Sequence, residues 1–236
     1  MIYAIGDLHL DYTKNKAMDI FGENWINHEE KIFSKWKELI KDGDLVLLPG
    51  DISWALKLEE AYYDLKRVDQ LPGYKIITKG NHDFWWQGPK KLKSLGLETI
   101  TFIQNNSFIY NNVGIGGTRG WISKDWEGFN EQDEKIFARE LNRLNMSLSS
   151  IDSSVEIKIA MLHYPPFNTD FSPNEFVELM AEHKVDICIY GHLHAEGHRY
   201  VVEKEIYGIK FHCVSCDYIN FEPKIILWLC KLNMKK

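Results

Sequence analysis

Five short polar clusters, each placed directly after a β-branched or apolar run, constrain what this chain can fold into. The clusters read "IGDLHL", "LLPGDISW", "ITKGNHDFWW", "MLHYPP" and "IYGHLH", and they begin at residues 5, 47, 77, 161 and 189. Each apolar run has the length of a β-strand, so each cluster occupies the position where a strand ends. The strand ends of an open α/β sheet meet along one edge, where ligands bind. We therefore expect the polar side chains of all five clusters to converge in one cleft.

The rest of the chain alternates between short strands and amphipathic helices. The first half predicts strand 2–6, helix 27–41, strand 45–48, helix 57–69, strand 74–79 and helix 88–94. Three extended runs at 98–103, 107–110 and 113–116 then predict a meander. The second half predicts helix 130–148 with Asn130 as its N-cap, strand 157–161, helix 173–183 and strands 186–190, 198–203, 206–211 and 224–229. This alternation is typical of βαβ units, and the absence of repeats and linkers predicts one domain over residues 1–236.

Charge and hydropathy exclude some classes of partner. The chain has 28 basic and 34 acidic residues and a formal charge of −6, so nothing overall attracts it to nucleic acid or to an anionic membrane. A local basic groove stays open as an alternative. The longest apolar run, Ile225 to Cys230, is far shorter than the roughly 20 residues of a membrane-spanning helix. We expect no membrane association, and nucleic acid is a disfavoured partner.

Cysteine content and the N-terminal residues predict a cytoplasmic protein. Four cysteines in 236 residues do not resemble a disulfide framework, and the first residues carry no basic leader. Cys213 and Cys216 form one Cys-x-x-Cys motif, but it lies among extended runs and has no matching second pair. Buried structural cysteines are therefore favoured over a redox or zinc site.

The clusters together supply carboxylate, imidazole and amide groups but no thiolate. Such donors suit Mn, Fe, Zn, Ni or Co, and their number suits two ions about 3.5–4 Å apart with one bridging carboxylate. A lone His after a strand is more often an ordinary loop residue, but burying this many ionisable groups together without a metal would be costly. The candidate ligands are Asp7, His9, Asp51, Asn81, His163, His192 and His194.

The order of these motifs resembles that of the calcineurin-like metallophosphoesterase superfamily. Its pattern is Asp-x-His, Gly-Asp, Gly-Asn-His-(Asp/Glu), a later His and Gly-His-x-His, and this chain shows all five parts between residues 6 and 194. The resemblance implies a four-layer α/β/β/α sandwich with two mixed β-sheets and a dinuclear metal site at the sheet edge. It also implies that Asp51 bridges the two ions. One ion would be held by Asp7, His9 and His194, and the other by Asn81, His163 and His192.

The same resemblance implies a metal-dependent phosphohydrolase. A metal-bridging hydroxide would attack phosphorus. His82, if protonated, would donate to the leaving oxygen or stabilise the charge of the transition state, rather than bind metal. Asp83 would orient this loop or cap the helix at 88–94. Residues 52–55 read "ISWA" and lack the Asp-Arg pair of the Ser/Thr protein phosphatase branch, which argues against that branch and leaves the orienting partner of His82 unidentified.

The substrate and its contacts stay open at this point. We expect a small phosphorylated molecule, a phosphomonoester or a phosphodiester, with a nucleotide as one option; a nuclease and a non-catalytic metal-binding scaffold are the alternatives. Arg119 in "GGTRGW" could clamp a phosphate or form a surface salt bridge. Aromatic residues near the motifs could stack on a ring, although packing beneath loops is the more common use. They are Trp54, Trp85, Trp86, Trp121 and Trp126.

Overall fold

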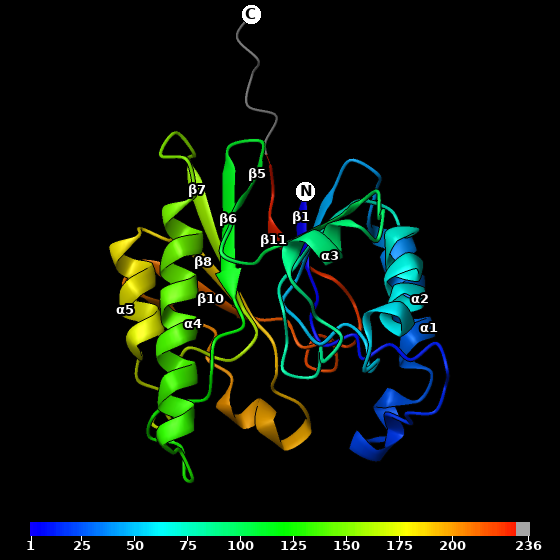
Figure 1. Ribbon diagram of the computed structural model, residues 1–236, viewed down its shortest axis with the longest axis horizontal. Helices are drawn as coiled ribbons and strands as arrows, with labels where there is room; N and C mark the ends of the chain where they lie inside the picture. The colour runs from blue at the N-terminus through cyan, green and yellow to red at the C-terminus, as the bar shows by residue number, and fades with distance from the viewer. Residues whose placement is uncertain (230–236) are drawn as a thin grey trace, which may run out of the picture.

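The computed structural model describes residues 1–229. It contains two facing β-sheets that lie between two layers of helices (Figure 1). The first sheet has the order β11-β1-β2-β3-β4 and the second β5-β6-β7-β8-β10-β9. The strands of the first sheet are β1 (Ile2–Ala4), β2 (Leu45–Leu48), β3 (Tyr74–Ile77), β4 (Ile100–Phe102) and β11 (Lys224–Leu227). Those of the second are β5 (Phe108–Tyr110), β6 (Val113–Thr118), β7 (Ile157–Leu162), β8 (Ile187–Tyr190), β9 (Glu205–Ile206) and β10 (Ile209–Cys213).

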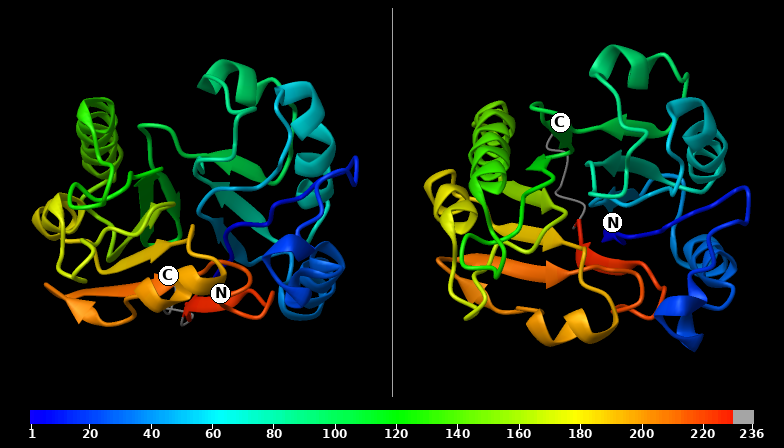
Figure 2. Two further views of the ribbon diagram at one scale, coloured as in Figure 1. Left: turned by 90° about the horizontal axis from the view of Figure 1, so that it is seen from below. Right: turned by 60° about the horizontal axis from the view of Figure 1, so that its bottom comes forward.

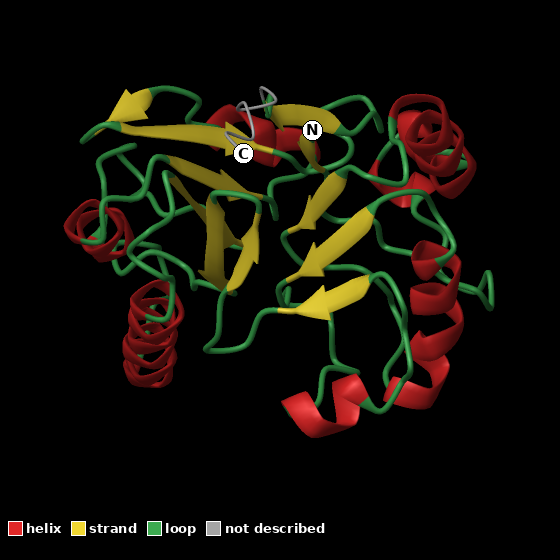
Figure 3. Ribbon diagram, turned by 90° about the horizontal axis from the view of Figure 1, so that it is seen from above, coloured by secondary structure: helices red, strands yellow, loops and turns green. Residues whose placement is uncertain are grey.

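The helices lie on the outer faces of the two sheets, as Figure 3 shows. The first sheet is covered by α1 (His28–Leu39), α2 (Leu58–Asp69) and α3 (Pro89–Lys93), and the second by α4 (Glu131–Ser149) and α5 (Glu175–Glu182). Each sheet contains parallel and antiparallel pairs, because β11 pairs antiparallel with β1 and β5 antiparallel with β6. The predicted four-layer α/β/β/α sandwich with two mixed sheets is confirmed.

The core consists of three apolar layers that follow from the two-residue period of the strands. Ile2 and Leu47 face the second sheet and pack with Ile159 and Ile189, which are buried in the layer between the sheets. Tyr3, which follows Ile2 in the strand, points the other way, toward the helices on the first sheet. Strands buried on both faces in this way read as continuous apolar runs rather than as alternating ones.

Helix α4 begins where the sequence predicts it. The side chain of Asn130 accepts hydrogen bonds from the backbone N–H groups of Gln132 and Asp133, and Asp133 accepts one from the backbone of Asn130. This reciprocal capping satisfies backbone donors that a helix start leaves unpaired. The N-cap prediction for Asn130 is confirmed.

Three predictions about the strands are wrong. The single strand predicted at 206–211 crosses a turn, because β9 and β10 are separate strands that pair antiparallel. The predicted meander does not form, because β4 pairs with β3 in the first sheet and only β5 and β6 pair with each other, in the second. The predicted strand at 198–203 is replaced by the 3₁₀ helix η3 (Ala195–Tyr200). There the backbone N–H and C=O of Val202 hydrogen-bond to the hydroxyl of Tyr190, so a side chain takes the place of a neighbouring strand. The tendency of a segment to be extended does not identify the strand with which it pairs. A side chain can also take the backbone hydrogen bonds that a neighbouring strand would otherwise make.

The described residues also address the cysteines and the membrane prediction. Cys188, Cys213 and Cys216 are buried and free, as expected of structural cysteines, and Cys230 lies outside the described residues. No helix within residues 1–229 has the length and apolar character needed to span a membrane. The prediction of one domain over 1–236 and the cytoplasmic location both stay predictions.

Strand direction sets the position of the polar clusters. β1, β2 and β3 are parallel to one another, as are β6, β7 and β8. Their carboxyl ends point toward the bottom of Figure 1, and Figure 2 shows the loops that follow them from that side. The loops after these strands therefore meet at one edge of the sandwich, where both sheets contribute.

Candidate metal centre

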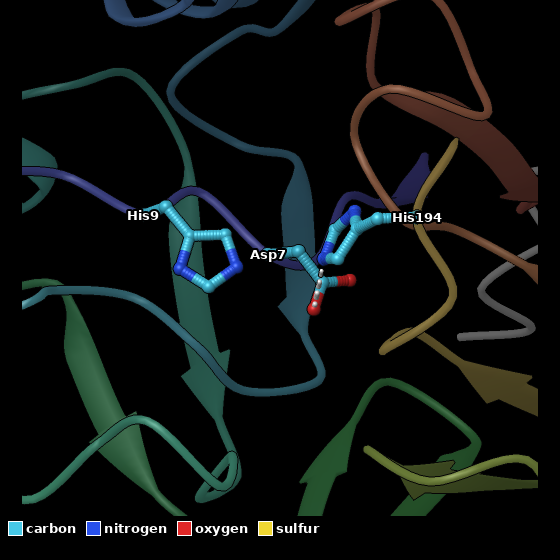
Figure 4. Close-up of side chains that lie close together, drawn as sticks. All are labelled: Asp7, His9 and His194. Carbon is cyan, nitrogen blue, oxygen red and sulfur yellow. Dashed lines mark ion pairs between the residues drawn. The ribbon is translucent and has the colours of Figure 1, made fainter. Parts of the chain in front are cut away.

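The side chains predicted as metal ligands come together at this edge. Asp7 Oδ1 lies 3.5 Å from His194 Nε2 and 3.8 Å from His163 Nδ1. Asp51 Oδ2 lies 3.5 Å from His163 Nε2 and 3.8 Å from His9 Nε2. Figure 4 shows the ring of His194 against the Asp7 carboxylate and the ring of His9 to the left of both. Two groups of potential ligand atoms result, Asp7 with His9 and His194, and Asp7 with Asp51 and His163.

The backbone at four of these positions adopts the left-handed region that is uncommon for residues other than glycine. The φ angles are 58° at Asp7, 46° at His9, 53° at Asp51 and 74° at His192. Such residues cost free energy and persist where the surrounding structure holds them, which is typical of functional sites.

Glycines let the carboxylates approach the neighbouring loops. A Cβ atom at Gly80 would overlap the carboxylate of Asp51, and one at Gly191 would overlap the carboxylate of Asp7. The backbone N–H of His192, next to Gly191, donates to both oxygens of Asp7 at 3.1 Å. Glycine is thus required at both positions for close approach of backbone to carboxylate.

Three polar atoms that can each accept a hydrogen bond or bind a cation converge at this edge. Asn81 Oδ1 lies 2.6 Å from His163 Nε2 and 2.9 Å from His192 Nδ1. His163 Nδ1 is 3.0 Å from the carbonyl oxygen of Pro49, so it carries the proton and leaves Nε2 with a lone pair. Burial lowers the pKa of His163 to about 4 and that of His192 to about 3, so both rings are neutral near pH 7. A cation bound between these atoms would satisfy all three.

Buried carboxylates point to the same conclusion. Burial, followed by the charges of Asp83 and Asp7, raises the pKa of Asp51 well above its ordinary value. Without a counter-charge, the ionised form of Asp51 is unfavourable here, and a divalent cation would supply that charge. The residues present therefore fit a metal centre with oxygen and imidazole ligands.

Asp217 is a site residue that the sequence analysis missed. Its Oδ1 lies 2.8 Å from His194 Nδ1, on the side of the ring opposite Asp7. Although burial lowers it, the charge of Asp7 and the hydrogen bond with Asp217 raise the pKa of His194 to about 10. A carboxylate behind a metal-ligating His fixes the ring and the proton position. The sequence feature that could have identified Asp217 is that it follows the predicted strand 206–211, as the other polar clusters follow their strands.

We expect Asp217→Asn to weaken metal binding without removing a ligand. The Mn²⁺ affinity should fall about 10- to 100-fold, because His194 loses the partner that orients it. Calorimetric titration of the metal-free protein with Mn²⁺ measures this change. Asp152→Asn, at an exposed turn, is the matched control and should leave the affinity unchanged. An unchanged affinity in Asp217→Asn would mean that His194 needs no orienting carboxylate.

Asp83 ties two of the ligand-bearing loops together. Its buried carboxylate accepts hydrogen bonds from the backbone N–H groups of Gly80 at 2.8 Å, Asp51 at 2.9 Å and Ile52 at 2.9 Å. It also accepts one from the indole N–H of Trp85 at 3.0 Å. The alternative that Asp83 caps the helix at 88–94 is wrong, because Gly88 is the N-cap of α3. Asp83 orients the loop, as the first alternative proposed.

We expect Asp83→Ala to lower the free energy of unfolding by about 3 kcal/mol or more. Burial raises the pKa of this carboxyl, so its charge carries a cost. Alanine would remove this cost but would leave four buried donors without an acceptor. Each buried unpaired group costs roughly 1–3 kcal/mol, so the loss of the acceptor outweighs the relief from the buried charge. Urea unfolding of the metal-free protein measures the loss. Asp83→Asn, which keeps one acceptor oxygen, should lose less, and an equal loss in both variants would contradict the assigned role.

His82 is surrounded by aromatic rings rather than by a carboxylate. Its ring centroid lies 4.6 Å from that of Trp54, 5.7 Å from that of His9 and 6.1 Å from that of Phe84. Its backbone N–H donates to Asp51 Oδ1 at 2.8 Å, which places the ring beside the ligand cluster. Burial lowers the pKa of His82, so the neutral imidazole is favoured. Trp54, the ring closest to His82 among these three, also stacks on His9, with centroids 4.7 Å apart.

Arg119 does not join the ligand cluster through its side chain. The guanidinium lies over the ring of Trp121 at 4.3 Å, and Nη2 is 3.5 Å from the buried carboxylate of Glu140. The backbone carbonyl of Arg119 accepts hydrogen bonds from His163 and Tyr164. Its contact to the site is therefore through the backbone, and its role as a phosphate clamp stays a prediction.

An α/β/β/α sandwich with buried Asp, Asn and His side chains at the carboxyl ends of its strands defines a protein of the metallophosphoesterase type. The family model of calcineurin-like phosphoesterases matches residues 1–196, and the chain belongs to this family. A search of curated proteins gave no match.

Solved structures share the fold at low sequence identity. The phosphopantetheinyl hydrolase PptH from Mycobacterium tuberculosis is 13% identical with a TM-score of 0.57, and the alignment covers 91% of this chain and 89% of that one. A protein of unknown function from Aquifex aeolicus is 17% identical with a TM-score of 0.49, covering 95% and 94% of the two chains. At 13% identity the similarity to PptH is one of fold alone.

Proposed function

We propose that this protein is a metal-dependent phosphohydrolase that cleaves a phosphomonoester or a phosphodiester at a centre of two divalent ions. The observation that carries the proposal is the convergence of Asn81 Oδ1, His163 Nε2 and His192 Nδ1, three acceptors within 3.3 Å of one another. These atoms would hold one ion. Asp7, His9 and His194 would hold the other, with Mn, Fe, Zn, Ni or Co as the candidates.

The bridging role of Asp51 is supported by its position. Its Oδ2 lies within 3.8 Å of imidazole nitrogens from both ligand groups, His9 and His163. Two divalent ions, when bound, would polarise the phosphoryl oxygens and activate a water. Asp217 and the Pro49 carbonyl hold the protonated nitrogens of two ligand rings away from the ions. The neutral ring of His82 still carries one N–H, which we assign to hydrogen bonding with the leaving oxygen.

The substrate class follows from the family and from the charge of the chain. We propose a small phosphorylated molecule, in agreement with the similarity in fold to PptH, a phosphopantetheinyl hydrolase. With a net charge of −6 the chain offers no general attraction for nucleic acid, so a nuclease is not favoured.

The test compares the hydrolysis of bis-p-nitrophenyl phosphate and p-nitrophenyl phosphate by Mn-loaded protein, with the Asp51→Asn variant as the blank. Faster cleavage of the diester would assign a phosphodiesterase and direct the search to cyclic nucleotides. Faster cleavage of the monoester would direct it to phosphorylated metabolites. Metal binding without metal-dependent turnover of either ester would contradict the proposal and favour a non-catalytic scaffold.

A further inference from the structure

An aromatic cavity of about 330 Å³ opens beside His192 and His194, two of the proposed metal ligands. Both residues line the cavity, so it lies next to the proposed metal centre. Its volume lies within the range of pockets that bind small molecules. The rings that line it are those of Trp121, Trp126, Tyr164, Phe167 and Tyr200.

The rings extend from the metal ligands outward. The centroid of Tyr164 lies 4.1 Å from that of His192, and Trp121 lies 5.3 Å from Tyr164. Farther out, Trp126 lies 6.4 Å from Tyr200 of the 3₁₀ helix η3. The indole of Trp121 is held in place, because its N–H donates to Asp133 at 3.0 Å. The wall of the cavity is therefore made of rings from three separate segments.

Tryptophans near the motifs differ in how far they are buried. Trp85 and Trp86 are buried in the core of the first sheet, as expected for packing beneath a loop. Trp126 is different, because it lines the cavity and leaves 48% of its surface exposed. Exposing so large an apolar ring beside a metal centre forfeits the free energy of its burial, which a bound ligand would restore.

Several polar groups in the wall already have hydrogen-bond partners within the protein. The hydroxyl of Ser123 is 2.8 Å from Asn168 Oδ1, and the side-chain amide of Asn168 donates to Ser172 at 3.0 Å. The backbone N–H of Thr169 donates to Asp125 at 2.9 Å. No Asp, Glu, Lys or Arg lines this cavity among the described residues. A strongly hydrated group would lose water here without gaining matching partners, whereas a flat apolar group would not.

We propose that this cavity binds the organic part of the substrate, and that this part is a flat aromatic group rather than a polyol or an acidic chain. The inference rests on the proposed function, because the phosphoryl group anchored at the metal centre brings the ring into the cavity. Stacking on Trp126 and Tyr200 would give preference by ring shape with little dependence on ring substituents. Substrates of the enzyme would then be phosphate esters of aryl alcohols or of nucleosides.

The experiment measures binding of phosphonates, whose carbon–phosphorus bond is not an ester, to the Mn-loaded full chain. Phenylphosphonate and 2-phenylethylphosphonate are compared with methylphosphonate and ethylphosphonate by calorimetric titration. We expect the compounds with a ring to bind at least about 10-fold more tightly than the alkyl compounds, which is the range of one base–aromatic stack. Trp126→Ala, and separately Tyr200→Ala, should remove most of this difference while leaving methylphosphonate binding unchanged.

Trp228→Ala is the matched control, because Trp228 is 67% exposed and does not line the cavity. It should keep the full difference between the two kinds of phosphonate. Equal binding of ring and alkyl compounds to the unmodified protein would overturn the inference and leave the proposed function standing. Failure of all four phosphonates to bind metal-loaded protein would instead overturn the proposed function, and the inference with it.

Discussion

Asp51→Asn is expected to abolish metal-dependent hydrolysis and to reduce the bound metal. Asp51 Oδ2 stands 3.5 Å from His163 Nε2 and 3.8 Å from His9 Nε2, between the two groups of ligand atoms. An amide in its place removes the negative charge that offsets two divalent cations. It also presents N–H donors or a weaker oxygen to the ions. Metal content by elemental analysis and turnover of both p-nitrophenyl esters measure the outcome.

Loss of metal in this variant can be separated from loss of the fold. Burial and the neighbouring carboxylates raise the pKa of Asp51, so in the metal-free protein its ionised form lowers stability as the pH rises through that pKa. Asparagine has no charge to bury and retains an oxygen that can accept the His82 N–H. We therefore expect the metal-free variant to unfold in urea no earlier than the metal-free parent at neutral pH. Retention of two ions with full activity would refute the bridging role.

His82→Ala is expected to keep both metals and to slow turnover by at least about 100-fold, the lower range for a lost acid–base group. The ring of His82 lies beside His9 and Trp54, outside the two groups of potential ligand atoms. Its backbone N–H, which bonds to Asp51, is retained in alanine. Elemental analysis and steady-state kinetics of the same preparation test both halves of this expectation.

The leaving group distinguishes donation by His82 from a general effect on the site. If the His82 N–H hydrogen-bonds to the leaving oxygen, the slowing should be greater for phenyl phosphate, whose leaving oxygen is more basic than that of p-nitrophenolate. Phe84→Ala removes a ring next to His82 without removing the N–H, and we expect it to slow turnover less than about 10-fold. Metal loss in His82→Ala, or equal slowing with both leaving groups, would contradict the assigned role.

Local patterns predicted much of the fold and the positions of the candidate ligands along the chain. The strand ends at Asp7 and His163 and the N-cap at Asn130 depend on residues near in sequence, and the structure places them as expected. The extended runs of β4 and β5 were also found, but not the fact that they belong to different sheets. Pairing depends on the path of the chain between the runs, and that path leaves no periodic signal in the sequence.

The sequence by itself determined which donor atoms this protein has and at which strand ends they stand, because spacing and strand period are local properties. Only the tertiary structure decided which groups meet. Asp217 contacts His194 across 23 positions, and Asp83 reaches the Asp51 loop across 32. The rings of Trp126 and Tyr200, 6.4 Å apart, likewise become neighbours only through folding. Such contacts depend on sheet order and on loop paths, which are fixed by packing of the whole chain rather than by any short segment of it.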